Sequence, residues 1–197
     1  MKTQRLEAFS DGVLAIILTI MVLELKIPHG DTWADIKPLV PILLSYILSF
    51  VYIGIYWNNH HHMLHVTTRT TGAMLWANLH LLFWLSLIPF TTGWMGENHF
   101  AAIPTAAYGF VMLGSGVAYW ILQRTIIRSQ GSNSALAKLI GRDLKGKLSP
   151  LLYTLAIAGA FIHPAIAGFL YVVVAAIWLL PDRRIELHLA EIEQAEA

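Results

Sequence analysis

The sequence predicts an all-α integral membrane protein with six transmembrane helices per subunit and both termini in the cytoplasm. Two observations of composition lead to this fold class: 56% of the 197 residues are hydrophobic, and only 13% are charged, about half the share that is typical of a soluble domain. A third is that apolar runs long enough to cross a bilayer recur along the chain. This composition excludes a soluble enzyme, a disordered chain and a nucleic-acid-binding protein.

The charge and the cysteine content narrow the function further. Thirteen Lys and Arg oppose twelve Asp and Glu, so the net charge of +1 does not favour a polyanionic partner. The chain has no cysteine, which excludes disulfides, thiolate-bound zinc, iron–sulfur clusters and cysteine nucleophiles.

Four transmembrane helices follow directly from the apolar runs. A span needs about 20 apolar residues to cross a hydrocarbon core roughly 30 Å thick. On this measure we expect spans at residues 5–25, 39–57, 73–95 and 102–122. A cleaved signal peptide is not expected, because Asp11 and Glu24 interrupt the first apolar run and no small-residue cleavage site follows it.

The apolar stretch at residues 151–180 is too long for one straight span and short for two. Lys and Arg collect on cytoplasmic flanks of spans, and they occur on both sides of this stretch, so both of its ends are expected in the cytoplasm. We therefore predict two short helices with a tight turn near His163 and Pro164, since proline discourages a continuous helix.

The positive charges also orient the whole chain. With the N-terminus inside, the external segments hold only Lys26 and Lys37 of all the Lys and Arg, which is the asymmetry expected for cytoplasmic termini. Residues 129–134, rich in Gly, Ser and Asn, predict a flexible cytoplasmic loop. We treat residues 1–184 as one six-helix domain and residues 185–197 as a short polar cytoplasmic tail. Residues 183–196 are predicted to form a short, exposed helix.

Polar side chains gather at the cytoplasmic ends of the first three predicted helices. The bilayer penalises such groups unless they are paired or line a wet path. The topology places the following residues at a similar depth: Arg5, Ser10, Asp11, Trp57, Asn58, His60, His61 and Asn78. Arg5 and Asp11 are too far apart to pair along one helix face, so we expect their partners on the second and third helices. These residues suggest a buried network that fixes helix register. Catalysis is not expected, because no nucleophile lies beside a base and an orienting group.

The histidines raise the question of a metal or haem site. His61 and His65 have the i, i+4 spacing that can place two imidazoles on one metal, and His80 and His163 suggest membrane haem ligands. However, His62 and His65 fall where the second helix leaves the membrane, and the predicted topology puts His163 on the opposite side from the others. We therefore expect neither a metal nor a cofactor.

One face of the first helix forms a continuous apolar stripe when it is projected at ~100° per residue. The stripe contains Phe9, Gly12, Ile16, Ile20 and Leu23, with Thr19 beside it. Phe9, Ile16 and Leu23 repeat every seven residues, the spacing with which identical helices pack around a shared axis. On periodicity alone, packing inside one subunit is the favoured explanation, because such stripes are common in an apolar protein.

The sequence from Arg5 to Asp11, Arg-Leu-Glu-Ala-Phe-Ser-Asp, resembles the R-x-x-x-F-S-D signature of the transmembrane protein 175 family of endolysosomal potassium channels and their bacterial relatives. Other stretches look like the same family: residues 12–16, Thr19, residues 56–61 (Tyr-Trp-Asn-Asn-His-His), Asn78, residues 89–90 and residues 178–184. The resemblance runs from Arg5 to about residue 186, which is most of the chain.

This resemblance implies a passive potassium channel and not an enzyme. It implies a homotetramer in a bacterial plasma membrane, with four first helices lining a central pore and no TVGYG filter loop. Carried over by position, Ile16, Ile20 and Leu23 form the apolar constriction with Thr19 beside them. The motif residues that hold this helix are Arg5, Phe9, Ser10, Asp11, Trp57, His60 and His61. A proton-coupled secondary transporter is the alternative, but it needs ionisable residues near the midplane, whereas this sequence keeps them toward helix ends.

Overall fold

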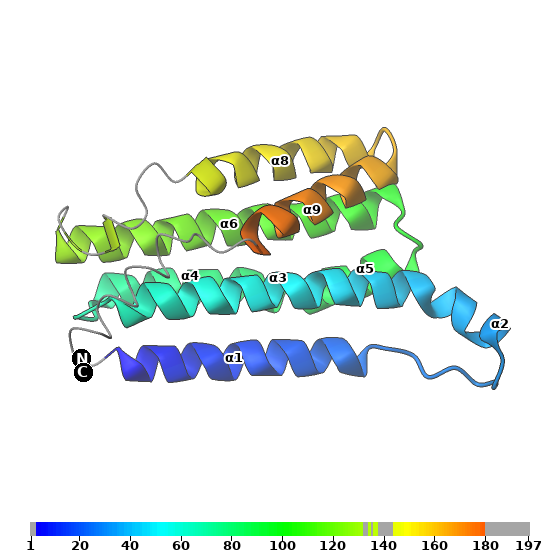
Figure 1. Cartoon of the computed structure of the whole chain (residues 1–197), viewed down its shortest axis with the longest axis horizontal. Coiled ribbons are helices and arrows are strands. Elements are labelled where there is room, and N and C mark those ends of the chain that lie inside the picture. Colours follow the sequence, from blue (N-terminus) through cyan, green and yellow to red (C-terminus); the bar gives the residue numbers. More distant parts are fainter. Residues whose placement is uncertain (1–2, 132–133, 135, 138–143, 180–197) are drawn as a thin grey trace.

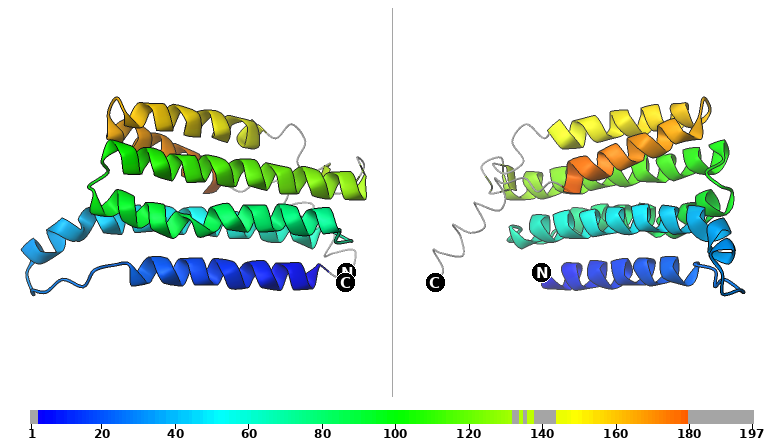
Figure 2. Two further views of the ribbon diagram at one scale, coloured as in Figure 1. Left: turned by 180° about the vertical axis from the view of Figure 1, so that it is seen from behind. Right: turned by 45° about the vertical axis from the view of Figure 1, so that its right-hand side comes forward.

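Figure 1 shows the computed structural model of the chain, which describes residues 3–131, 134, 136–137 and 144–179. The regular structure of these residues is helical, and the long helices run side by side as one bundle (Figures 1 and 2). Among the described residues, four helical segments are long and apolar enough to cross a bilayer: Gln4–Leu23, Trp33–His65, Gly72–Glu97 and Ala102–Gln130. The prediction of an all-α multi-pass membrane protein is therefore confirmed.

The first helix, α1 (Gln4–Leu23), lies close to its predicted bounds and occupies one edge of the bundle in all three views. A short helix α2 (Trp33–Ile36) and a 3₁₀ turn η1 (Lys37–Leu39) lead into α3 (Val40–His65). The helix α3 continues eight residues beyond residue 57, where the second apolar span was predicted to end, and includes the histidines. No Gly or Pro interrupts residues 58–65, so the helix extends beyond its apolar part.

The third predicted span consists of two helices, α4 (Gly72–Ser86) and α5 (Ile88–Glu97). They meet at Leu87, two residues before Pro89, and together they make the apolar segment Gly72–Glu97, which contains the span predicted at residues 73–95. Proline lacks the N–H that would bond the carbonyl of Leu85, and its ring crowds that carbonyl.

The remaining helices are α6 (Ala102–Gln130), α8 (Leu144–Ala160) and α9 (Pro164–Leu179). α6 is longer than predicted and ends before Gly131, whose φ of +93° only glycine adopts readily. Residues 129 and 130 are thus helical and not part of a loop. The predicted turn near His163 is confirmed, since α8 and α9 are separated by residues 161–163 alone. The predicted tail at residues 185–197 and its helix lie outside the described residues.

Hydroxyl groups join α3 to α5, α6 and α9. The hydroxyls of Ser49 and Thr92 lie 2.7 Å apart, and Ser49 also donates to the hydroxyl of Tyr108 at 3.2 Å. One turn further along α3, the Tyr52 hydroxyl donates to the backbone carbonyl of Tyr171 at 2.6 Å. All of these side chains are buried. Polar groups in an apolar solvent need such partners, so these bonds hold α3, α5, α6 and α9 in register.

Small residues allow α6 and α9 to approach closely. A side chain on Gly109 of α6 would collide with the hydroxyl of Tyr171 and with the side chain of Ile157. The Tyr171 hydroxyl uses this space to donate to the carbonyl of Thr105 at 2.9 Å. Glycine is common at such contacts between membrane helices, because it lets backbones come together.

Candidate functional site

The two faces of α1 differ in burial. One face packs on α3, α4 and α5 and contains the buried residues Leu6, Ser10, Leu14, Ile17 and Met21. The opposite face is exposed and contains the whole predicted stripe: Phe9, Gly12, Ile16, Thr19, Ile20 and Leu23. Ile16 is 59% exposed and Leu23 is 80% exposed. The stripe is therefore not packed inside the described part of its own subunit.

The exposed stripe is apolar apart from one hydroxyl. Thr19 donates its hydroxyl hydrogen to the carbonyl of Ile16 at 2.8 Å, so its oxygen lone pairs remain available to a group outside the helix. Two residues of the stripe, Ile16 and Ile20, also line a hollow of about 780 Å³ between α1 and α5. Phe90 and Trp94 of α5 form its other wall. The site thus presents an apolar ridge that borders a large open groove.

A buried chain of hydrogen bonds links α1 to α4 and α3. The Ser10 hydroxyl donates to the carbonyl of Leu6 at 2.8 Å and accepts from the amide nitrogen of Asn78 at 2.9 Å. The amide oxygen of Asn78 lies 2.7 Å from Nε2 of His60. Because that oxygen is an acceptor, Nε2 carries the proton in this arrangement, and Nδ1 of His60 is then an acceptor without a partner in the described part of the chain. Ser10 and Asn78 are fully buried, and His60 is 2% exposed.

A second set of contacts joins α1 to α3 at the surface. The indole N–H of Trp57 donates to Asp11 Oδ1 at 3.0 Å, and Nδ1 of His61 lies 2.7 Å from Glu7 Oε1. Glu7 and Asp11 are four residues apart on α1, and Trp57 and His61 are four residues apart on α3. The earlier residue of α1 pairs with the later residue of α3, as antiparallel helices require. The rings of Trp57 and His61 also stack, with centroids 6.2 Å apart.

The structure places the predicted anchoring residues in three groups. Ser10, Asp11, Trp57, His60, His61 and Asn78 make the contacts above. Phe9 lies on the exposed stripe, and Arg5 and Asn58 are exposed and make no polar contact in the described part of the chain. The expected partner of Arg5 on the second or third helix is thus not found among these residues. Sequence reasoning missed Glu7, although its spacing of four from Asp11 matches that of Trp57 and His61.

His80 and His163, the two histidines considered as haem ligands, each accept a hydrogen bond from a neighbouring residue on their own segment. His80 accepts the indole N–H of Trp84 at 3.0 Å, and His163 accepts the backbone N–H of Ala165 in the turn between α8 and α9. The rings of His61 and His65 have centroids 6.0 Å apart. Within the described ranges, no three His, Asp or Glu side chains come together as a metal site would require.

Comparison with known proteins gives the family of this chain. Residues 5–89 match the model of the endosomal/lysosomal potassium channel TMEM175. A potassium channel of Chryseobacterium sp. (strain P1-3) is 55% identical over 187 residues, which cover 95% of this chain and 97% of that protein. The human endosomal/lysosomal proton channel TMEM175 is 34% identical over 93 residues, 41% of this chain and 18% of the human protein.

The fold agrees with a solved member of the same group. The crystal structure of a lysosomal potassium-selective channel TMEM175 homologue from Chamaesiphon minutus superposes with a TM-score of 0.74 at 28% identity, covering 90% of this chain and 96% of that one. The signature that begins at Arg5 lies within the matched residues, and the Chryseobacterium relative aligns over nearly the full length of both chains. The chain therefore belongs to the TMEM175 channel family.

Proposed function

We propose that this protein is a potassium channel that conducts passively through a pore on the shared axis of four identical subunits, lined by α1. The observation that carries this proposal is the exposed apolar stripe of α1, whose opposite face is held by hydrogen bonds to α3 and α4. A helix that is fixed on one side and apolar on the other suits a position at a symmetry axis. The names of the bacterial relatives, potassium channels, support the permeant ion.

In the proposed membrane layout, the bundle crosses the membrane six times within residues 1–184, and both termini are cytoplasmic. The spans are α1, α3, α4 with α5, α6, α8 and α9. The start of α1, the end of α3, the start of α4 and the end of α6 lie at the same end of the bundle (Figure 1), and the excess of Lys and Arg in the segments at this end supports a cytoplasmic location. The proposed membrane is a bacterial plasma membrane, and the protein needs no cofactor and catalyses no reaction.

The proposed gate is a ring of apolar side chains. Four copies of Ile16, Ile20 and Leu23 would form narrow constrictions that water leaves, so the pore closes by dewetting. A potassium ion must give up part of its hydration shell to pass, and aliphatic side chains offer few oxygens in return. The hydroxyl oxygens of Thr19 supply a polar level between these rings. Selectivity is therefore expected to be moderate.

A flux assay tests the function. Purified protein in liposomes should carry potassium down its gradient without any coupled ion, faster than sodium and unlike protein-free liposomes. A parallel arm with a pH-sensitive dye measures proton flux, since the human relative is named a proton channel. Potassium uptake that requires a proton gradient would instead establish a carrier.

Single-cysteine variants test the position of α1. The chain has no cysteine, so Ile16→Cys introduces one reactive thiol per subunit on the stripe, and a short bis-maleimide should link subunits in pairs into covalent dimers. The matched control is Phe169→Cys on α9, which is 67% exposed and faces lipid in the proposed assembly. Cross-linking through position 169 but not through position 16 would show that α1 does not lie at the symmetry axis.

A further inference from the structure

The exposed face of α6 carries an apolar stripe that becomes basic at one end. Its residues follow one another at spacings of three, four and seven, which place them on one side of the helix: Ile103, Phe110, Val117, Trp120, Arg124 and Arg128. In the proposed layout, the basic end lies at the cytoplasmic side of the membrane. Aliphatic residues, an indole and guanidinium groups thus follow one another in the order in which a bilayer leaflet presents hydrocarbon, interface and phosphate.

The apolar part of the stripe lines a hollow of about 440 Å³ between α5, α6 and α8. Besides Phe110 of α6, its walls include Phe90 of α5 and Phe161 of α8. Thr91 is the one polar residue among the described residues that line it, and its hydroxyl donates to the carbonyl of Ile88 at 3.2 Å. Such walls gain dispersion contacts from a hydrocarbon chain and leave a polar ligand without a partner.

Two cations without an acidic partner form the basic end. Arg124 and Arg128 are exposed, and neither makes an ion pair in the described part of the chain. The guanidinium carbon of Arg124 lies 5.6 Å from the ring centroid of Trp120, and this stacking holds the charge at the edge of the apolar stripe. The described residues of α6, α8 and α9 include no Asp or Glu. The positive charge of this end is therefore available to an anion.

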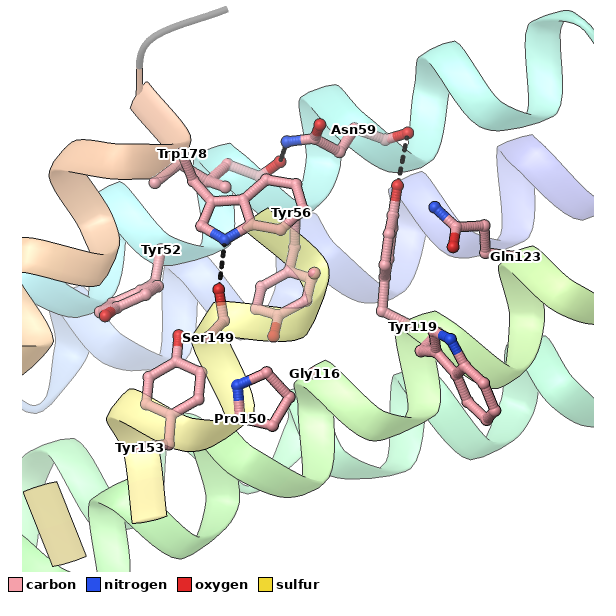
Figure 3. Close-up of a pocket in the computed structure, with 13 residues that line it drawn as sticks. Tyr52, Tyr56, Asn59, Gly116, Tyr119, Gln123, Ser149, Pro150, Tyr153 and Trp178 are labelled. Carbon is pink, nitrogen blue, oxygen red and sulfur yellow. Dashed lines mark hydrogen bonds between the residues drawn. The ribbon is translucent and has the colours of Figure 1, made fainter. Parts of the chain in front are cut away.

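The first turn of α8 adds a third cation, the exposed Lys147. Trp120 of α6 and Gly146 of α8 line the same cavity, which Figure 3 shows, so the start of α8 lies beside the basic end of the α6 stripe. Basic sites between membrane helices at the cytoplasmic side attract anionic lipid headgroups.

The hollow and the basic end are one lipid length apart. Phe110 and Arg124 are separated by 14 residues, which is ~21 Å along a helix. One leaflet of a bilayer that is about 40–45 Å thick measures about 20–22 Å. A phosphate bound at Arg124 therefore places the ends of its acyl chains at Phe110, where the hollow begins.

We propose that this groove, the exposed face of α6 between α5 and α8, binds an anionic phospholipid of the cytoplasmic leaflet. The phosphate pairs with Arg124 and Arg128, and the acyl chains follow the stripe to the hollow. A neighbouring subunit is disfavoured as the occupant, because α8 and α1 lie at opposite edges of the bundle (Figures 1 and 2) and the proposed assembly puts α1 on the axis. The choice of leaflet rests on the proposed membrane layout, whereas the site itself does not depend on conduction.

Native mass spectrometry of the full-length protein in detergent tests the proposal. Titrations with dioleoylphosphatidylglycerol and dioleoylphosphatidylcholine compare two lipids that share their chains and differ in headgroup charge. We expect the dissociation constant of the anionic lipid to be lower by about tenfold or more, since each cation near the headgroup contributes about fivefold. Arg124→Gln and Arg128→Gln should each reduce this ratio by about fivefold. The matched control is Arg5→Gln, which removes one charge at the same end of the bundle from α1 and should leave the ratio unchanged.

A second variant fills the hollow. Ala107 lines it, so Ala107→Phe should weaken both dioleoyl lipids and leave their ratio as it is. Dihexanoylphosphatidylglycerol, whose chains are too short to reach the hollow, should bind the parent and this variant equally. The matched control is Ala158→Phe, at an exposed position of α8 that does not line the hollow. If Ala107→Phe fails to fold, the variants of the exposed arginines still decide the question.

Four results would overturn the proposal. They are equal affinity of the parent for the two dioleoyl lipids, an unchanged ratio in both arginine variants, and an equal loss in Arg5→Gln, which would show attraction by net charge alone. The fourth is displacement of the anionic lipid by inorganic phosphate at the same concentration, which would identify a site for the free anion. The assay measures lipid binding and not ion flux, so its failure leaves the proposed channel function untouched, and a failed flux assay leaves this site untouched.

Discussion

Replacing Asn78 by leucine should remove the centre of the buried chain that joins α1, α3 and α4. The substitution deletes the bond to Ser10 at 2.9 Å and the bond to His60 at 2.7 Å. Hydrogen bonds between membrane helices average about 0.6 kcal/mol each, and stranding a buried polar group costs about 1–3 kcal/mol. His60 would then lack partners at both ring nitrogens, since Nδ1 has none already. We expect a total loss of about 2–4 kcal/mol in the free energy of unfolding.

The assay is unfolding in mixed micelles by added sodium dodecyl sulfate, at one fixed protein concentration. Asn58→Leu is the matched control, because Asn58 is exposed and lacks polar contacts in the described residues; it should change stability by less than about 0.5 kcal/mol. A double-mutant cycle with Ser10→Ala isolates the bond between Ser10 and Asn78, for which we expect a coupling of about 0.6–1.7 kcal/mol. Additive effects, or equal losses in the Asn78 and Asn58 variants, would refute the reasoning.

Three further predictions concern α1 and the core. Ile16→Asn should make the pore leaky and less selective in the liposome assay, whereas Val22→Asn, exposed but off the stripe, should not; equal selectivity in both would exclude Ile16 from the constriction. Asp11→Ala removes the carboxylate that accepts the indole N–H of Trp57, so it should reduce the fraction of protein that forms tetramers or alter channel opening. An unchanged tetramer fraction with unchanged currents would contradict this role. Gly109→Ala should cost about 1–3 kcal/mol by overpacking, whereas Gly168→Ala, with open space around it, should stabilise the protein by up to about 1 kcal/mol in the same unfolding assay.

The sequence predicted best those elements that depend on apolar length and on proline. The bounds of α1 and the turn before Pro164 follow from these local signals. The end of α3 at His65 was missed because hydropathy reports where a chain is apolar, and not where it ceases to be helical. The break at Leu87 was missed although Pro89 follows it by two residues, because the residues on both sides of it are apolar and hydropathy does not register the break.

The candidate site was only partly accessible from sequence. Ser10 and Asn78 could be grouped because topology placed them at one depth, but the pairing of Glu7 with His61 depends on the register between α1 and α3. That register is set by side-chain packing and leaves no motif. The cavity between α3, α6, α8 and α9 (Figure 3) was not predicted, because its walls come from four helices whose aromatic residues look individually like ordinary core.

Hydrogen bonds hold α1 to its neighbours near its N-terminal end but not along the rest of its length in the described structure, so in the proposed pore the other end of α1 is freer to move. Its polar contacts to α3 and α4 fall at residues 7–11, whereas its buried residues from Leu14 onward are apolar and can slide. Leu23 lies ~20 Å from Ser10 at ~1.5 Å per residue, so a tilt of about 10° about the anchored end moves Leu23 by ~3 Å.

Loosening the anchor should therefore free this motion. In the proposed pore, Asn78→Leu is expected to raise potassium flux through the liposome assay, because α1 would tilt more readily. Gly109→Ala, which destabilises the protein at the contact between α6 and α9, supplies the comparison at matched loss of stability. If both variants change flux equally, flux follows overall stability and α1 does not pivot. If only Asn78→Leu raises it, the hydrogen bonds near the N-terminal end of α1 set the resting position of the proposed gate.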